Sequence, residues 1–165
     1  MLELLLPAGY KPVLDELETE KAIRKIKNLF QENLAFELSL QRVTAPLFVK
    51  AGTGINDNLN GVEKPVSFVL KDADGVTAEI VHSLAKWKRM KLGALKTAPG
   101  KGIYTDMNAI RPDEEVDNLH SFYVDQWDWE KVVTAQDRNL DYLKSTVRRI
   151  YYAIRRTEAA ITADY

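Results

Sequence analysis

The chain has 165 residues, of which 45% are hydrophobic and 28% charged, as in an ordinary globular domain or a large part of one. Lysine and arginine number 23 against 24 acidic residues, and this net charge of -1 argues against a nucleic-acid or anionic-membrane partner. The lack of cysteine excludes disulfides, thiolate nucleophiles and thiolate metal sites, and fits a reducing compartment.

The first seven residues, Met1–Pro7, are mostly apolar but do not have the pattern of a signal peptide. They lack a basic start, and Glu3 and Pro7 interrupt the apolar run. No other stretch approaches the length of a membrane span. We therefore expect a cytoplasmic protein without a membrane partner.

The next part of the chain predicts a helix, a strand and a loop. Apolar residues recur near helical spacing from Asp15 to about Leu34, with lysines and glutamates between them, which predicts an amphipathic helix. The alternation over Leu38–Val43 predicts a strand that ends at Ala45-Pro46. Gly52–Gly61 is rich in glycine, asparagine and aspartate and predicts a long ordered loop.

Two short strands and a helix are predicted after this loop. Val66–Leu70 and Thr77–Val81 flank the turn residues Asp72–Gly75, so an antiparallel pair with a tight turn is expected. Leu84–Leu92 follows as a helix that carries several basic residues.

The last part of the chain predicts two strands and a long helix. The strands, Ile103–Ile110 and Ser121–Trp129, are separated by the polar segment Arg111–Leu119, which is longer than a hairpin needs. From Leu140 to Ile161 apolar residues form the clearest helical stripe of the chain. No glycine, asparagine or proline stop signal follows this helix.

The strand predicted at Ser121–Trp129 has two different faces. Gln126 and Asp128 share one, and Tyr123, Trp127 and Trp129 share the other. Packing best explains the aromatic face, whereas a buried amide and carboxylate need partners, such as the ammonium group of an amino acid. The alternative is that the polar face is the solvent side of an edge strand.

Basic residues offer two candidate anion sites. Arg111 ends a predicted strand, where it could bind a phosphate or carboxylate or be an ordinary surface arginine. A second group could be a nucleic-acid patch, an anion site or, as we expect for most of its members, a solvated helix face; it comprises Lys86, Lys88, Arg89 and Lys91 beside Trp87.

Other polar residues point to no familiar motif. Asp57 lies in the loop, where aspartate commonly forms turns. His82 and His120 are far apart in sequence, which favours structural roles over zinc binding, and we predict no metal site. The sequence contains no P-loop, dinucleotide-binding fingerprint or nucleophile elbow.

Four segments together nevertheless resemble one family: Asn56–Lys64, Val81–Arg89, Arg111–Glu114 and Tyr123–Trp129. In this order they resemble the signature blocks of bacterial ammonia-dependent asparagine synthetases, also called aspartate-ammonia ligases, and the similarity extends over essentially the whole chain. Ala45-Pro46 resembles the first, dimer-forming motif of class II aminoacyl-tRNA synthetases, and Arg111–Glu114 resembles their second motif. The resemblance implies an α+β fold, built on an antiparallel sheet flanked by helices, and a homodimer.

The resemblance also implies a reaction, the ATP-dependent amidation of L-aspartate with ammonia. The side-chain carboxylate would attack the α-phosphorus of ATP to give an aspartyl adenylate and pyrophosphate, and ammonia would then displace AMP. Magnesium and arginine would offset the phosphate charge. ATP with magnesium is then a co-substrate, and no tightly bound cofactor is expected.

The resemblance assigns five residues to the aspartate substrate. Lys88 and Asp128 would hold its α-carboxylate and α-ammonium groups, with Ser83 assisting. Asp57 and Gln126 would lie near the side-chain end where ammonia enters, and Asp57 would take up a proton as nitrogen attacks.

Three further residues are assigned to the nucleotide. Arg111 would face the α-phosphate and the reacting carboxylate, while Glu114 and Ser121 would approach the nucleotide. Family members are considerably longer, so residues 1–165 would be the N-terminal portion of one catalytic domain, without the third superfamily motif and part of the ATP site. We expect this portion to be incomplete at its C-terminus and inactive by itself.

Two other readings stay open. The chain could be a non-catalytic amino-acid-binding or regulatory relative of the class II synthetases, or a dimerisation or scaffold module that kept the first motif. A role in tRNA binding ranks last because of the balanced charge.

Overall fold

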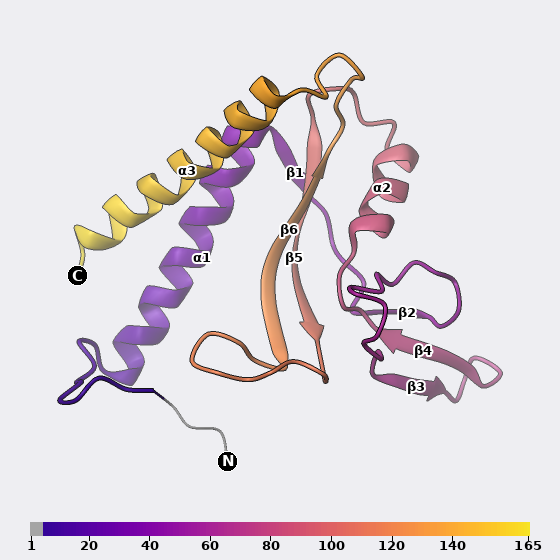
Figure 1. The fold of residues 1–165 in the computed structure, drawn as a ribbon, viewed down its shortest axis with the longest axis horizontal. Coiled ribbons are helices and arrows are strands. Elements are labelled where there is room, and N and C mark those ends of the chain that lie inside the picture. The colour runs from indigo at the N-terminus through magenta and orange to yellow at the C-terminus, as the bar shows by residue number, and fades with distance from the viewer. Residues whose placement is uncertain (1–4) are drawn as a thin grey trace. The chain divides into compact units, whose positions relative to one another are not determined.

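The computed structural model describes residues 5–165, so most of the apolar segment Met1–Pro7, namely residues 1–4, lies outside the described residues. The described chain is an α+β protein (Figure 1). Its elements in chain order are α1 (Glu16–Leu38), β1 (Leu40–Arg42), β2 (Phe48–Lys50), β3 (Ser67–Leu70), β4 (Val76–Ile80), α2 (Ala85–Ala94), β5 (Gly102–Ile110), β6 (Tyr123–Lys131) and α3 (Leu140–Thr162). Within residues 5–165, no helix has the length and apolar character needed to cross a membrane.

The chain divides into two compact units. The sheet unit comprises Arg42–Thr97 and Ile103–Glu130 together with Leu5. The helix-pair unit comprises Leu6–Gln41, Ala98–Gly102 and Lys131–Tyr165.

The two long helices of the helix-pair unit begin at side chains that cap them. The carboxylate of Asp15 accepts a hydrogen bond from the Glu18 N–H at 2.8 Å, and the Asn139 side chain accepts one from the Tyr142 N–H at 2.9 Å. Each cap satisfies a backbone donor that has no partner inside its own helix. Ser39 caps the C-terminus of α1 with a left-handed φ of 58°.

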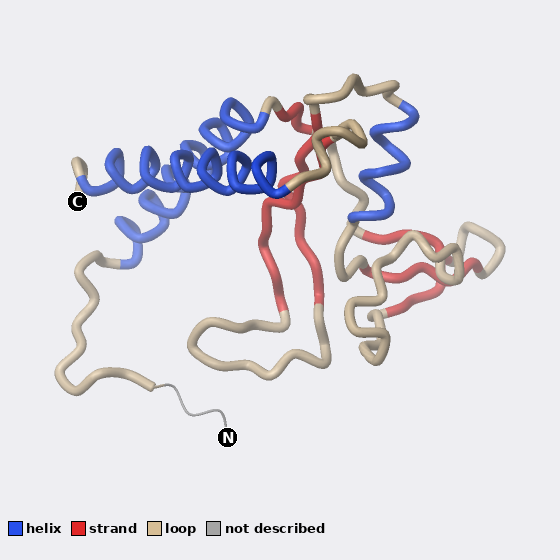
Figure 2. The backbone as a smooth tube through the Cα atoms, turned by 45° about the horizontal axis from the view of Figure 1, so that its top comes forward, coloured by secondary structure: helices blue, strands red, loops and turns tan. Residues whose placement is uncertain are grey.

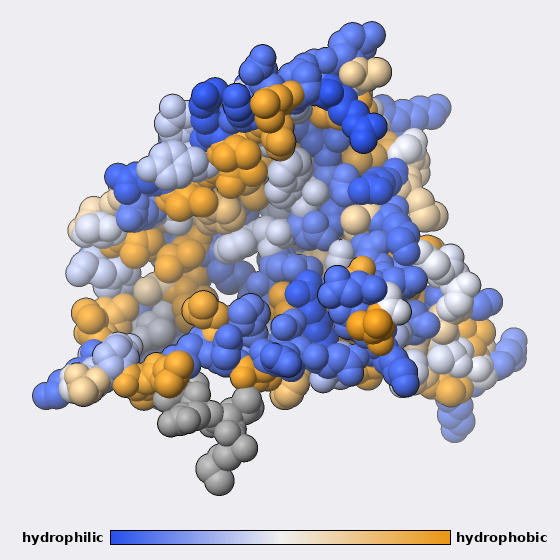
Figure 3. All heavy atoms as spheres, viewed as in Figure 1, coloured by the Kyte–Doolittle hydropathy of each residue, from blue (hydrophilic) through white to orange (hydrophobic). Residues whose placement is uncertain are grey.

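Helices α1 and α3 lie side by side and run antiparallel (Figure 1). The buried residues of the two helices are Ala22, Leu34 and Leu38 on α1 and Ala153 and Thr157 on α3. Asn33 Nδ2 donates to Thr157 Oγ1 at 3.3 Å. Many large apolar side chains of this unit are exposed, and Figure 3 shows apolar side chains gathered along the helix pair.

The first sheet of the sheet unit has the strand order β2-β4-β3. Both neighbours pair antiparallel with β4, with Phe68 opposite Ala78 and Val49 opposite Glu79. The predicted antiparallel pair is therefore confirmed. Asp74 and Gly75 take the positive φ values of 52° and 74° in the turn, which explains the turn residues there.

The second sheet has the order β1-β5-β6. The Gly102 N–H donates to the backbone oxygen of Ser39, and the Val43 N–H donates to that of Tyr104. From the first hydrogen bond to the second, the residue numbers rise on both strands. This is the pattern of a parallel pair, so β1 runs parallel to β5. The expectation of one antiparallel sheet is therefore corrected to two small sheets, one of them mixed.

The core of the sheet unit is formed by Val81, Leu84, Met107 and Ala109. Val124 of β6 packs against it from the strand face that also carries Gln126 and Asp128. The interpretation of the opposite, aromatic face as packing is wrong for Tyr123, which is 55% exposed. The polar pair therefore shares its strand face with a core residue.

Several elements differ from the predictions. Leu38 ends α1 instead of starting a strand, so β1 is only Leu40–Arg42. Strand β2, Phe48–Lys50, was not predicted, because three residues after a proline carry no readable alternation. Strand β6 begins at Tyr123 instead of Ser121. Figure 2 shows the two long loops of the sheet unit, one before β3 and one between β5 and β6.

Candidate functional site

Asp57 lies in the loop between β2 and β3 and caps α2 from a distance. Its Oδ2 accepts hydrogen bonds from Ser83 Oγ at 2.8 Å and from the Ala85 N–H, the first residue of α2, at 2.7 Å. The residue at the usual cap position, Leu84, has no side chain that could do this. A carboxylate at a helix N-terminus also interacts favourably with the helix dipole. The Asp57 side chain is therefore anchored, and it keeps Oδ1 for other partners.

Lys88 and Asp128 form an ion pair inside the sheet unit. The Lys88 side chain is fully buried, whereas 25% of the Asp128 side chain is exposed. A buried ammonium needs a charged partner because its loss of hydration is costly. The partly exposed carboxylate makes the pair reachable from solvent on one side only.

The backbone around Asp128 is held by the neighbouring strand. Thr105 is fully buried on β5, and its Oγ1 donates to the backbone oxygen of Asp128 at 3.2 Å. Gln126 is partly buried two residues earlier, on the same face of β6 as Asp128. The strand therefore presents an amide and a carboxylate together, as the sequence predicted.

Arg111 lies at the end of β5 and lines a hollow of about 600 Å³. Its backbone N–H donates to the Phe122 oxygen at 2.8 Å, and its Nε is buried without a hydrogen-bond partner among the described residues. A buried guanidinium N–H without a partner is a donor ready for a ligand. The other lining residues are Leu59, Asn60, Glu63, Asp113, Glu114 and Glu115.

Six of the predicted site residues thus fall into three groups within the sheet unit. Asp57 and Ser83 are bonded to each other, and Lys88 and Asp128 are bonded to each other. Arg111 and Glu114 share the hollow that the loop residues also line. The loop between β2 and β3 therefore contributes to the first and the third of these groups.

Ser121 is the predicted residue that the structure does not bring to this hollow. It is exposed, does not line the hollow, and its Oγ accepts from the Tyr123 N–H at 3.3 Å. This contact explains Ser121 as a residue that starts β6. Its assignment to the nucleotide gains no support from its position.

The basic residues of α2 have different environments. Lys88 is buried, Arg89 is exposed and lies 3.5 Å from Glu130, and Lys86 binds the loop before β3. The expectation of a solvated helix face, made for most of these residues, holds for the exposed Arg89, whereas Lys88 is buried. Lys88 lies one helical turn after Leu84, a core residue, on the same side of the helix.

The two histidines are in separate environments. His82 is 1% exposed, and its backbone N–H donates to Asn56 Oδ1 at 2.9 Å. His120 is exposed with its Nδ1 2.9 Å from Asp117 Oδ1. This hydrogen bond and the carboxylate charge raise the pKa of His120 above its ordinary value. Within residues 5–165, no three histidine or carboxylate side chains are grouped so that they could hold a metal ion.

Two polar residues next to the predicted site residues were given no role in the site from the sequence. Asn56 is 6% exposed and binds the end of β4, and Lys86 donates to two loop carbonyl oxygens. The loop contains three asparagines, and composition does not distinguish the buried one from the others.

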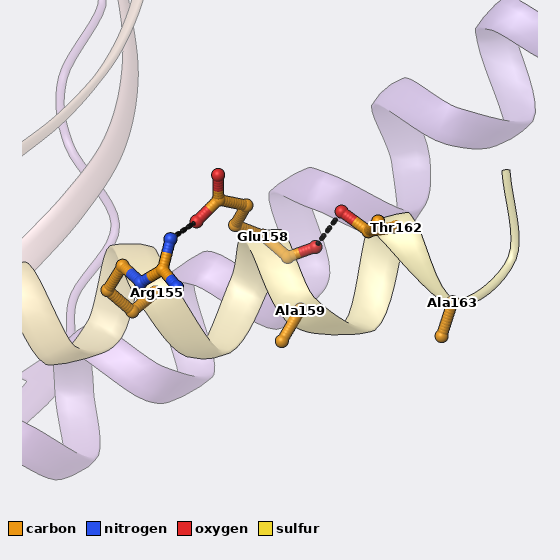
Figure 4. Close-up of a pocket in the computed structure, with 5 residues that line it drawn as sticks. All are labelled: Arg155, Glu158, Ala159, Thr162 and Ala163. Atoms are coloured by element: carbon orange, nitrogen blue, oxygen red, sulfur yellow. Dashed lines mark hydrogen bonds and ion pairs between the residues drawn. The ribbon is translucent and has the colours of Figure 1, made fainter.

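The helix-pair unit has hollows of its own, and they contain no predicted site residue. One lies along the last turns of α3 and is lined by Arg155, Glu158, Ala159, Thr162 and Ala163 (Figure 4). Its charged groups pair within the helix, because Arg155 binds Glu158. A second hollow is lined by Glu37, Tyr152, Arg155, Arg156 and Ala159. Neither has unpaired charges that converge on a ligand.

Comparison with known proteins identifies the family. The family model described as aspartate-ammonia ligase matches residues 17–165. Aspartate-ammonia ligases of Bacteroides fragilis, Bacteroides thetaiotaomicron and Clostridium perfringens are 61%, 59% and 54% identical over the whole chain. The chain covers 48%, 48% and 49% of these three relatives, so it spans about half their length. A match of this extent and identity shows that the chain belongs to the aspartate-ammonia ligase family.

Proposed function

We propose that the chain provides the aspartate-binding half of a ligase that makes L-asparagine from L-aspartate, ammonia and ATP. The observation that carries the proposal is the Lys88–Asp128 ion pair, a buried cation beside a partly exposed anion. These are the charges that the two α-substituents of an amino acid require. The membership in the family supports the same substrate.

Aspartate would bind by separating this ion pair. Its α-carboxylate would take Lys88 and its α-ammonium would take Asp128, so one ion pair becomes two and no charge is left alone. The side chain of aspartate would then extend away from β6. Ser83, whose Oγ donates to Asp57, would assist at this pocket.

Activation would use the hollow around Arg111. An oxygen of the side-chain carboxylate forms a bond to the α-phosphorus, the bond from that phosphorus to the bridging oxygen breaks, and pyrophosphate leaves. The free Nε of Arg111 can donate to the charged phosphoryl group during this step. Four carboxylates line the hollow with this one arginine, so ATP would enter as its magnesium complex instead of as a bare polyanion.

Amide formation would use the residues near the acyl carbon. The nitrogen of ammonia bonds to that carbon, the bond to the AMP oxygen breaks, and the nitrogen loses one proton. Asp57 Oδ1 is free of short hydrogen bonds among those described, with Lys86 Nζ at 3.8 Å, so this oxygen is the candidate to attract ammonium and accept the proton. Gln126 would bind the same end through its amide.

The remaining features of the proposal concern the whole protein. Residues 1–165 would be the N-terminal portion of a single catalytic domain whose remaining ATP contacts come from the other half. The resemblance of Ala45-Pro46 to a dimer-forming motif supports a homodimer. A cytoplasmic location is supported by the lack of cysteine in the sequence.

The test compares three proteins supplied with aspartate, ammonium, ATP and magnesium. These are the chain alone, the Bacteroides fragilis ligase, and a chimera that joins residues 1–165 to the part of that ligase beyond the matched half. We expect asparagine and AMP in equal amounts from the ligase and the chimera and none from the chain. An inactive but folded chimera would contradict the proposal, and an active chain would show that its ATP site is complete.

A second candidate is an amino-acid-binding relative without catalysis, because the charge pair for the amino acid lies within this chain. Calorimetric binding of aspartate by the chimera, without product, would favour it. Loss of binding in Asp128→Ala would locate the amino acid in either case.

A further inference from the structure

Asn56 is a buried polar residue that the proposed chemistry does not use. It is 6% exposed, and its side chain joins the loop before β3 to the end of β4. Nδ2 donates to the Ile80 oxygen at 3.2 Å and approaches Glu79 Oε2 at 3.5 Å, while Oδ1 accepts from the His82 N–H at 2.9 Å. One amide therefore satisfies backbone groups on both sides of Val81, a core residue.

Lys86 holds the same loop from α2. Its Nζ donates to the oxygens of Gly54 and Asn56 at 2.9 and 3.0 Å. The two carbonyl groups belong to residues just before Asp57 in the sequence. The backbone that leads into Asp57 is therefore held by β4, through Asn56, and by α2, through Lys86. Lys86 itself is exposed, so it ties the loop without contributing to the core.

The position of Asp57 follows from these contacts. Its Oδ2 accepts hydrogen bonds from Ser83 Oγ and from the Ala85 N–H. Both groups directly follow the segment Ile80–His82, whose backbone Asn56 binds. We propose that Asn56 and Lys86 are positioning residues that keep the Asp57 carboxylate on the N-terminus of α2 and aim its Oδ1 at the site. The part of this inference that concerns catalysis rests on the proposed function.

The other asparagines of the loop provide a matched comparison. Asn58 is exposed, and its backbone oxygen, not its side chain, accepts from the Gly61 N–H. Asn58 is the same type of residue in the same loop, two positions after Asn56, but its side chain makes no described hydrogen bond to β4. Asn58→Ala is therefore the control for Asn56→Ala.

The first experiment measures hydrogen exchange of the Ala85 amide by NMR in the 165-residue chain. Asn56→Ala and Lys86→Met should each speed this exchange about tenfold, because the Asp57 acceptor is no longer held in place. Asn58→Ala should leave it unchanged, and Lys86→Arg should restore protection because arginine can donate to the same oxygens. Because Lys86 is exposed, Lys86→Met folds even where Asn56→Ala does not. Unchanged protection of Ala85 in either variant would overturn the assignment of that residue.

The second experiment uses the chimera and separates KM from kcat. Both variants should lower kcat or raise the KM for ammonium about tenfold, with the KM for aspartate changed less than about twofold, because Lys88 and Asp128 are untouched. An equal loss toward both substrates would overturn the positioning role. If the unsubstituted chimera makes no asparagine, the proposed function fails, while the Ala85 exchange still decides whether Asn56 and Lys86 position Asp57.

Discussion

The sheet unit and the helix-pair unit bury different kinds of side chain. The sheet unit buries the polar side chains of Lys88, Thr105 and Asn56, each with a described charge or hydrogen-bond contact. The helix-pair unit leaves large apolar residues exposed on α3 and buries mostly apolar ones, namely Ala22, Leu34, Leu38, Leu40 and Ala153, together with Thr157. These exposed residues are Leu140, Leu143, Val147, Tyr151, Tyr152 and Ile154.

The two units therefore differ in what holds their side chains in place. Buried polar groups demand definite partners, so the sheet unit has little freedom to rearrange around its charges. An amphipathic helix with its apolar stripe exposed gains little stability from that stripe. We therefore expect substitutions to be costly at the buried charge in the sheet unit and at the buried apolar residues in the helix-pair unit.

The largest effect is expected when the buried ion pair is broken. Asp128→Ala leaves the fully buried Lys88 ammonium unpaired and should lower the free energy of unfolding by about 3 kcal/mol. Urea denaturation of the chain measures this loss. The double variant Lys88→Met with Asp128→Leu should recover most of the stability, because two apolar side chains need no partner. A double variant as unstable as the single one would show that the charge is not the cause.

The next effect tests the helix contact. Ala153 is fully buried between the helices, so Ala153→Leu should overpack the contact and cost about 1–3 kcal/mol. Ala159 lies on the same helix but is exposed, and Ala159→Leu should change the free energy of unfolding by less than about 0.5 kcal/mol. Equal urea midpoints for the two variants would mean that the helix pair is not tightly packed.

A smaller effect compares a distant helix cap with a local one. Asp57→Ala removes the acceptor for the α2 N-terminus, and Asn139→Ala removes the one for α3. Each should cost about 1 kcal/mol in urea denaturation, the usual cost of a lost cap. Only Asp57→Ala should also speed hydrogen exchange of Ala85. Fast exchange of Ala85 in Asn139→Ala would contradict the separation of the two units that this comparison assumes.

The smallest effect is a pH dependence in the exposed loop of the sheet unit. Asp117 raises the pKa of His120 above 6.5, so this contribution is complete below pH 6.5 and is lost as pH rises through the raised pKa. The pKa of Asp117 is lowered below 3.8, first by the Leu119 N–H and then by His120, so its contribution is complete above pH 3.8 and is lost as pH falls through the lowered pKa. The contact between Asp117 and His120 is therefore strongest between pH 3.8 and pH 6.5.

An NMR titration of the His120 ring checks this sign. In Asp117→Asn the pKa of His120 should move back toward 6.5, because the negative charge is gone. A pKa of His120 that does not change would show that the carboxylate is not its partner in solution.

Much of the secondary structure could be predicted because periodicity acts locally. The stripes of α1 and α3, the pair β3–β4 and the long strands β5 and β6 all follow from spacings within each segment. Strand β2 could not be found this way, because its three residues are ordered by their pairing with β4. The parallel pairing of β1 with β5 could not be predicted either, because the paired residues are about sixty positions apart in the sequence.

The family, the helices and strands of strong period, and the candidate residues Asp57, Ser83, Lys88, Arg111 and Asp128 could be predicted from residue type and order. Which of several similar residues is buried, and what that residue contacts, depends on the tertiary structure. Lys88 has the same side chain as Lys86, and Asn56 the same as Asn58, yet Lys88 and Asn56 are buried whereas Lys86 and Asn58 are exposed. They differ because packing removes one of each pair from water, and a polar group without water must find a definite partner.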